Sequence, residues 1–181
     1  MKNIIDFLTE DFDEYLNYSL KGFKEKVNAY TIDFTRGETV VSKLLCVEKT
    51  GHTEKEALII LTQRLLMINE EWLSFDDYSK EDVIRWTDYL KNNYEKASYL
   101  TNISLPADKD NCFITGVLAS ADVQSINYNK RHLSVKEFRD TNPLMNEQII
   151  SVSKSEFERL ECEFYIETTS HFLLYNWYTT A

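Results

Sequence analysis

The sequence predicts an α+β fold, in which helices pack on an antiparallel sheet. The strongest helical pattern lies in the stretch 53–97, where apolar residues recur at helical spacing in two consecutive segments. Segments on both sides of this stretch alternate between apolar and polar residues with the period of a strand. Because helical and strand segments are segregated rather than strictly alternating, we expect an α+β fold and not a parallel α/β fold.

The central stretch is predicted to form a helix pair, at about 54–74 and 80–97. Each helix is preceded by the pattern of a capping box, in which a hydroxyl and an acid three residues later satisfy open backbone N–H groups. The first box runs from Thr53 to Glu56 and the second from Ser79 to Asp82. The apolar side chains of this pair are expected to form the scaffold that packs on the sheet.

A third helix is predicted at the N-terminus, ending near Leu20 or Gly22, and we expect it to pack on the sheet as well. Its outward face carries Asp6 and a run of acids from Glu10 to Glu14. One face is apolar at helical spacing, and it comprises Ile4, Phe7, Leu8, Phe12, Tyr15 and Leu16.

Strand patterns flank the helices on both sides. Residues 27–47 predict a hairpin, and shorter strands are expected at 99–105 and 112–118. A capping box at 134–137 predicts a short helix that ends at Asn142-Pro143.

The C-terminus predicts an antiparallel hairpin that closes the sheet. Its first strand, around 161–167, is expected to show an acidic face, and its second, 172–178, is apolar on both faces. Between the short helix and this hairpin, residues 145–152 fit helix or strand, and Ser155-x-x-Glu158 could open one more helical turn.

Length and composition are those of one globular domain spanning 1–181, with 98–106 as the place where a weak subdivision could fall. Acids appear by Asp6, so no apolar signal core is visible, and no apolar run approaches the length of a membrane span. The three cysteines are widely spaced and form no metal or redox motif. We therefore expect a cytoplasmic protein with no membrane association, no metal and no cofactor.

Short catalytic motifs are missing from the sequence. It contains no phosphate-binding glycine loop, no H-E-x-x-H and no G-x-S-x-G. The histidines are His52, His132 and His171, and each has a simple structural explanation beside a helix start, in a polar loop or at a hairpin turn. No catalytic residue is assigned, and whether any of these histidines is functional stays open.

Charge is the most informative functional signal. The formal net charge is −10 and the sequence pI is about 4.8, which disfavours contact with duplex DNA and favours a basic protein partner. Acids and aromatics gather around the joint of the predicted helix pair, and this candidate partner-binding surface comprises Glu70, Glu71, Trp72, Phe75, Asp76, Asp77, Tyr78, Glu81 and Asp82. The alternative is that these aromatics belong to the core and the acids are a solvated joint.

Three classes of function fit these observations. The first is a small acidic inhibitor that binds the basic surface of a nucleic-acid enzyme, where acids around aromatics imitate phosphates and bases. The second is an immunity or antitoxin-like protein that neutralises a toxin. The third is an enzyme that acts on nucleic acid without a recognisable short motif.

At the level of class, the chain resembles the anti-CRISPR proteins of phages that infect low-GC Gram-positive bacteria. The resemblance rests on a small, acidic chain rich in Tyr, Asn and Lys, without enzyme motifs and with acidic runs such as Glu70-Glu71 and Asp76-Asp77. It implies a protein made in the host cytoplasm that binds an RNA-guided nuclease and blocks DNA recognition or cleavage. No motif matches residue by residue, so the resemblance assigns no functional residue.

Overall fold

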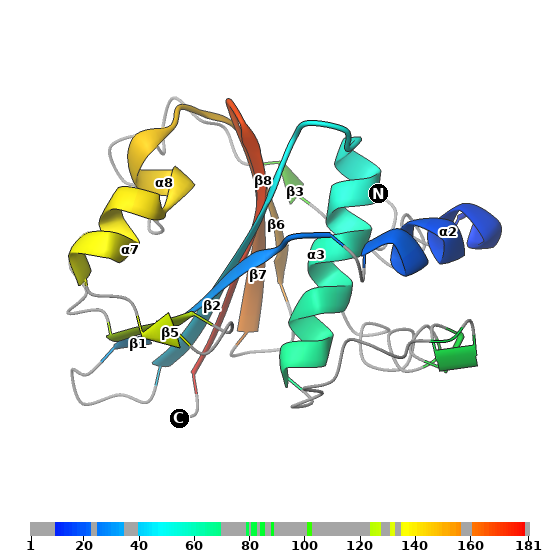
Figure 1. Ribbon diagram of the computed structural model, residues 1–181, viewed down its shortest axis with the longest axis horizontal. Coiled ribbons are helices and arrows are strands. Elements are labelled where there is room, and N and C mark those ends of the chain that lie inside the picture. The colour runs from blue at the N-terminus through cyan, green and yellow to red at the C-terminus, as the bar shows by residue number, and fades with distance from the viewer. Residues whose placement is uncertain are drawn as a thin grey trace.

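The α+β fold is confirmed by the computed structural model of the chain (Figure 1). Its strands form one antiparallel sheet of eight strands in the order β3-β6-β7-β8-β2-β1-β4-β5. The part of the chain that the structure describes comprises residues 10–22, 25–34, 40–69, 79, 81–82, 84–85, 88, 101–102, 124–127, 131–132, 135–156 and 161–179.

Two predicted hairpins form the middle of the sheet. β1 (Asn28–Phe34) pairs with β2 (Val40–Glu48), and β7 (Glu161–Thr168) pairs with β8 (His171–Thr179). The hairpins join where β2 lies antiparallel to β8, with Leu45 opposite Leu174. The last strand of the chain is therefore a central strand of the sheet.

The outer strands continue the sheet on both sides of these hairpins. β6 (Ile149–Glu156) lies beside β7, with an irregularity in register between Ile149 and Ser151, and β4 pairs with β1. The remaining short strands are β3 (Thr101–Asn102), β4 (Gln124–Asn127) and β5 (Arg131–His132).

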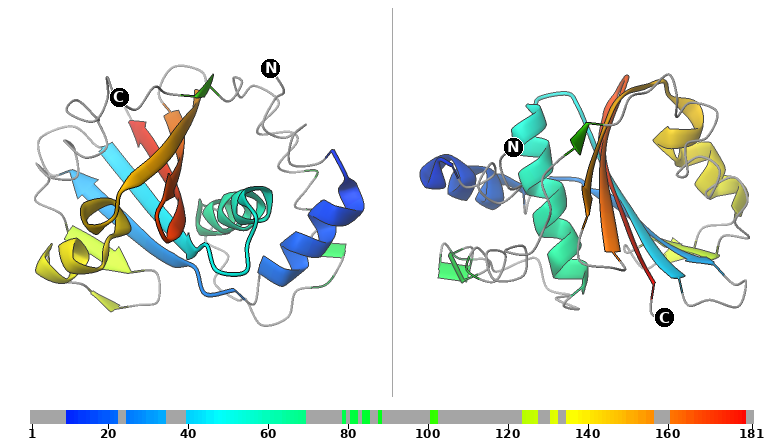
Figure 2. Two further views of the ribbon diagram at one scale, coloured as in Figure 1. Left: turned by 90° about the horizontal axis from the view of Figure 1, so that it is seen from above. Right: turned by 180° about the vertical axis from the view of Figure 1, so that it is seen from behind.

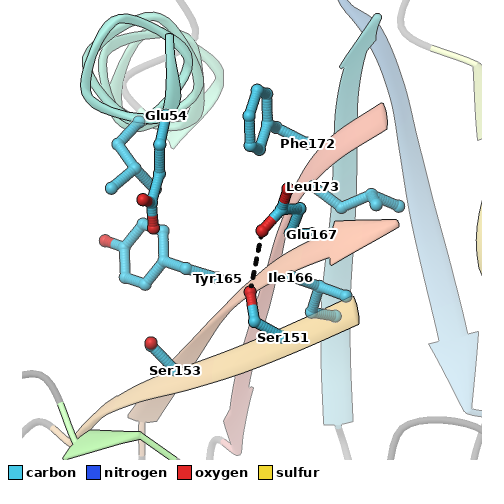
Figure 3. A pocket seen from close by; sticks show the side chains of 9 residues that line it. Glu54, Ser151, Ser153, Tyr165, Ile166, Glu167, Phe172 and Leu173 are labelled. Carbon is cyan, nitrogen blue, oxygen red and sulfur yellow. Dashed lines mark hydrogen bonds between the residues drawn. The ribbon is translucent and has the colours of Figure 1, made fainter. Parts of the chain in front are cut away.

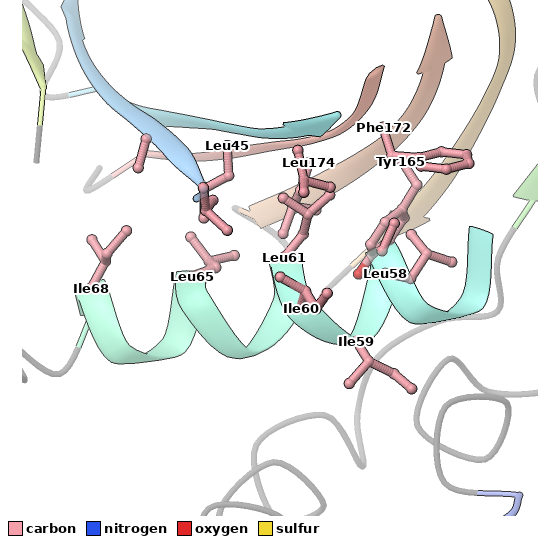
Figure 4. Close-up of a cluster of buried hydrophobic side chains, with 14 of the residues drawn as sticks. Leu45, Leu58, Ile59, Ile60, Leu61, Leu65, Ile68, Tyr165, Phe172 and Leu174 are labelled. Carbon is pink, nitrogen blue, oxygen red and sulfur yellow. The ribbon is translucent and has the colours of Figure 1, made fainter. Parts of the chain in front are cut away.

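The first central helix, α3 (Glu54–Asn69), packs on one face of the sheet (Figure 4). Leu58, Leu61 and Leu65 point toward the strands, where they meet the side chains of β2, β7 and β8. Thr53 caps the helix, since the backbone N–H of Glu56 donates to Thr53 Oγ1 at 3.2 Å, whereas the Glu56 carboxylate pairs with Lys21. The scaffold role predicted for this helix is confirmed.

The N-terminal helix forms a further layer outside α3. α2 (Phe12–Gly22) places Tyr15 and Leu16 in the same buried cluster as α3. Most of its described contacts are with α3, which lies between α2 and most of the sheet (Figures 1 and 2). Residues 1–9, where the sequence predicts the helix to begin, lie outside the described part.

Two short helices cover the opposite face of the sheet (Figure 2). α7 (Val135–Thr141) packs Phe138 edge-on against Tyr30 of β1, with 5.3 Å between the ring centroids. Asn142 does not only end α7, because its side chain accepts from the backbone N–H of Leu144 and so caps α8 (Pro143–Asn146). With helices on both faces of the sheet, residues 172–176 of β8 are buried on both sides, as the apolar sequence of this strand predicts.

Several predicted elements fall on residues outside the described part. The second central helix, 80–97, is described only at 81, 82, 84, 85 and 88, which are helical. Residues 70–74, the strand 112–118 and most of 98–106 are not described, so the proposed subdivision stays a prediction. Ser155 and Glu156 belong to β6, and residues 157–160 lie outside the described part, so the helical turn expected after Ser155 stays a prediction.

No helix among the described residues combines the length and the apolar character needed to cross a membrane.

Candidate functional site

Two of the nine residues predicted to bind a partner are described by the structure, Glu81 and Asp82. Glu70, Glu71, Trp72, Phe75, Asp76, Asp77 and Tyr78 lie outside the described residues. The structure therefore tests the predicted acidic joint only at its C-terminal end.

Asp82 serves the local helix. Its carboxylate accepts from the hydroxyl of Ser79 at 2.7 Å and from the Ser79 backbone N–H at 3.0 Å, and the Asp82 N–H donates back to Ser79 Oγ at 3.2 Å. Arg85 pairs with the other carboxylate oxygen at 2.6 Å. The hydrogen bonds from Ser79, followed by the charge of Arg85, lower the pKa of Asp82. This geometry confirms the second capping box and commits Asp82 to it.

Two segments that carry exposed acidic and apolar residues lie at one end of the molecule. They are α2 and the helical residues 81, 82, 84, 85 and 88, green in Figure 1, which lie on the same side of α3 in all views (Figures 1 and 2). Phe12 is 38% exposed and Ile84 is 39% exposed. Exposed acids flank both, and we call this surface the acidic end: Glu10, Asp11, Phe12, Asp13, Glu81, Ile84 and Asp88.

Ion pairs hold α2 of the acidic end against α3. Lys55 of α3 pairs with Glu14 of α2, and Tyr18 donates to the same carboxylate at 3.2 Å. Lys21, near the end of α2, pairs with Glu56 of α3. These contacts hold α2 against α3, while Asp13 in its first turn is exposed.

His52 lies inside this helix interface. Its Nδ1 lies 3.4 Å from Glu56 Oε1 and its Nε2 lies 3.5 Å from Glu25 Oε2, and its side chain is almost fully buried. Burial opposes the charge of Glu56, but the hydrogen bond and charge of Lys21, together with the nearby imidazole of His52, outweigh it and lower the pKa of Glu56. The structural role expected for His52 beside a helix start therefore accounts for its position.

His171 lies at the β7–β8 turn, as predicted, and is held by a carboxylate that the sequence did not single out. Its Nδ1 lies 2.8 Å from Oε1 of Glu147, the residue that follows α8. The second oxygen, Oε2, accepts from the hydroxyl of Thr168 at 2.6 Å and from the backbone N–H of Ser170 at 3.1 Å. Glu147 thus connects α8 to the central hairpin.

The pKa of Glu147 reflects these contacts. Burial by itself opposes its charge, but the Thr168 hydroxyl, the Ser170 N–H and His171 together lower the pKa below the ordinary value of 4.5. For His132, the third histidine, the structure describes only the backbone, which lies in β5. Cys46, the described candidate for a thiol nucleophile, is buried, and burial raises its pKa to about 12, which leaves it unreactive.

A row of buried polar residues crosses four neighbouring strands on the α3 side of the sheet. In this row Lys43 lies opposite Asn176, Asn176 opposite Glu163, and Glu163 opposite Ser155, and all four are buried. They lie on the α3 side because Leu45, Leu174 and Tyr165, two residues away in the same strands, pack against α3.

The sequence predicts an acidic face for the strand 161–167, and that prediction is wrong at Glu163. The side chain of Glu163 lies inside the protein and accepts from the hydroxyl of Tyr165 at 2.6 Å. Lys43 donates to the side-chain oxygen of Asn69 at the end of α3. Alternation alone could not find this row, because it places a strand residue on a face without saying which face is covered.

A small recess opens between β6, β7 and the start of α3 (Figure 3). Its lining includes Glu54, Ser153, Tyr165 and Glu167, and the hydroxyl of Ser151 donates to Glu167 at 3.2 Å. It has room for about one water molecule. This recess is too small to be the binding site of an organic substrate.

No cluster of three or more His, Cys, Asp or Glu side chains that could hold a metal ion occurs within the described ranges. No family model matches the chain, and no curated protein or solved structure matches it.

Replacing Tyr165 by Phe tests the buried polar row. We expect a loss of about 1.5–3 kcal/mol in the free energy of unfolding, because a buried carboxylate loses a donor. Tyr18→Phe is the matched control: it removes a hydroxyl that donates to the more exposed Glu14 and should cost less than about 1 kcal/mol. Urea denaturation measures both, and equal small losses would show that Glu163 does not depend on Tyr165.

Replacing Glu147 by Gln tests the pH dependence of the contacts that this carboxylate makes with Thr168, Ser170 and His171. A carboxyl whose pKa is lowered on folding contributes stability that is fully present above its unfolded pKa and is lost as the pH falls through its folded pKa. We expect the difference in unfolding free energy between wild type and Glu147→Gln to hold at neutral pH and to narrow below about pH 4.5. Urea titrations from pH 7 to pH 3 measure it, with Glu54→Gln as the baseline. A difference that stays constant to pH 3 would contradict this account.

Proposed function

We propose that this chain is a small acidic protein that binds and inhibits a basic, nucleic-acid-processing protein. The most specific form of the proposal is an inhibitor of an RNA-guided host-defence nuclease, as the resemblance to anti-CRISPR proteins implies. Such nucleases hold nucleic acid in positively charged channels. An acidic surface with exposed apolar side chains is complementary to such a channel.

The observation that carries the proposal is the acidic end. Phe12 and Ile84 are exposed there among acids from two separate segments of the chain. Single exposed apolar residues are common, but two at the same end of a strongly acidic protein suit a protein–protein interface. Glu81 belongs to the surface first expected from the sequence, and the acids of α2 extend that surface.

The attachment of α2 supports the same proposal. Glu14 and Glu56 are neutralised by lysines within the interface between α2 and α3, whereas Asp13 and Glu81 are exposed. Because these ion pairs hold α2 in place, the exposed Asp13 that it carries loses little freedom when a partner binds. More of its attraction to a basic partner then contributes to affinity.

Charge reversal at the acidic end tests the proposal. We expect Asp13→Lys/Glu81→Lys to weaken binding to a purified Cas9-type ribonucleoprotein by at least about tenfold, because like charges placed together cost several kcal/mol. The wild-type affinity should also fall steeply between low and physiological salt. Biolayer interferometry measures the binding, and target-DNA cleavage measures the inhibition.

The matched control is Asp140→Lys/Glu48→Lys, which reverses two exposed acids located away from the acidic end. Changing an acid to lysine raises the charge by two, and each double variant makes this change twice. Both variants therefore raise the net charge from −10 to −6. The control should bind as wild type does. Equal weakening of both variants, or binding that ignores salt, would contradict a role for the acidic end, and no binding at all would exclude this class of nuclease as the partner.

A further inference from the structure

His52 lies between two carboxylates, and each of its ring nitrogens faces one of them. Nδ1 lies 3.4 Å from Oε1 of Glu56, and Nε2 lies 3.5 Å from Oε2 of Glu25. The ring is almost fully buried, with 6% of the side chain exposed. A neutral imidazole carries one N–H and one lone pair, so it can donate toward only one of these carboxylates and directs its lone pair at the other. An imidazolium has an N–H on both nitrogens, so protonation removes this mismatch.

Three segments of the chain meet at this ring. His52 lies in the connection between β2 and α3, Glu56 lies in the first turn of α3, and Glu25 lies between α2 and β1. Lys21, in the last turn of α2, pairs with the same oxygen of Glu56. The contact between Glu25 and His52 therefore fastens the chain that follows α2 to the start of α3, and it is made only while that chain lies against α3.

We propose that His52 is a pH-sensitive clamp that holds α2 on α3. When the ring takes up a proton, it attracts Glu25 and Glu56 together and draws the connection after α2 against α3. When the ring is neutral, this part of the attachment is lost, and α2 is held by its lysine pairs and its apolar contacts. The proposal concerns the attachment of α2 and does not depend on the partner assigned to the acidic end.

The charges around the ring determine the direction of the effect. Within the described residues the carboxylate of Glu25 has no lysine or arginine partner, since Arg64 contacts its backbone carbonyl, at 3.5 Å, and not its carboxylate. Lys21 opposes a second cation, but it contacts Glu56 and not the ring, and it is half exposed. Burial disfavours a charge, yet a buried cation with two carboxylates beside it is the arrangement in which proteins keep one. The interface also contains one further ion pair and one phenol, from Lys55, Glu14 and Tyr18.

Docking of α2 is therefore coupled to proton uptake by the ring. It strengthens as the pH falls through the range in which histidines titrate, about pH 6.5. Glu56 adds nothing to this change. Burial opposes its charge, but Lys21 and His52 lower the pKa of Glu56 below the ordinary value of 4.5, so it stays ionised throughout the range.

The test is native-state hydrogen exchange of the α2 amides in the full chain at pH 7.5, 6.5 and 5.5, corrected for the intrinsic rate at each pH. We expect protection of the amides from Tyr15 to Leu20 to rise at least about threefold from pH 7.5 to pH 5.5, the effect of one added ion pair. His52→Gln should remove this rise, because an amide does not titrate. Glu25→Gln should reduce it strongly while the ring stays in place.

The matched control is His171→Gln, which removes a histidine that faces the carboxylate of Glu147 instead of one beside α2. It should keep the full rise at α2. Protection of α2 that does not change with pH in wild type would overturn the proposal, as would an equal rise in wild type and His52→Gln. If His52→Gln does not fold, Glu25→Gln decides the matter, because an undiminished rise in that variant would overturn the proposal equally.

Discussion

The enclosure of α3 is the constraint on which the rest of the structure depends. Every residue from Glu56 to Gln63 is buried, although a helix on a protein surface normally buries one stripe. Its apolar stripe packs on β2, β7 and β8, and α2 covers it from outside. A sequence such as Ala57-Leu58-Ile59-Ile60-Leu61 is stable in water only when several layers surround it, because each large side chain contributes roughly 1.5–3 kcal/mol on burial.

Enclosure also places a buried carboxylate, Glu56, inside the interface, where a charge needs partners. Lys21 and His52 provide them, and in doing so they hold α2 on α3. The orientation of α2, and with it the exposed acids beside Phe12, follows from that requirement. On the other face of the sheet, Glu147 plays a comparable role by connecting α8 to the turn of the central hairpin. The surface proposed for binding thus depends on Glu56, a carboxylate that also organises the fold.

Local patterns in the sequence were enough to predict much of this fold. The capping boxes at Thr53 and Ser79 and the C-terminal hairpin depend on interactions within a few residues, so they could be read directly. Contacts between residues far apart in the sequence could not be predicted in this way. Glu163 alternates like a surface residue, yet it is buried because α3 and the neighbouring strands cover that face. His171 was visible as a turn residue, but Glu147, 24 positions earlier, becomes its partner only through the fold. Most of the predicted acidic joint, Glu70 to Tyr78, lies outside the described residues and stays a prediction.

Native-state hydrogen exchange tests the central claim most directly, because it reports the free energy at which each backbone amide opens. If α3 is the enclosed element on which the rest of the fold depends, its amides from Leu58 to Leu65 should exchange only through global unfolding. The amides of β2 and β8 should exchange in the same way. The amides of α2, which lies outside α3, should open at a lower free energy. Exchange of the α3 amides at a free energy well below that of β8 would contradict this account.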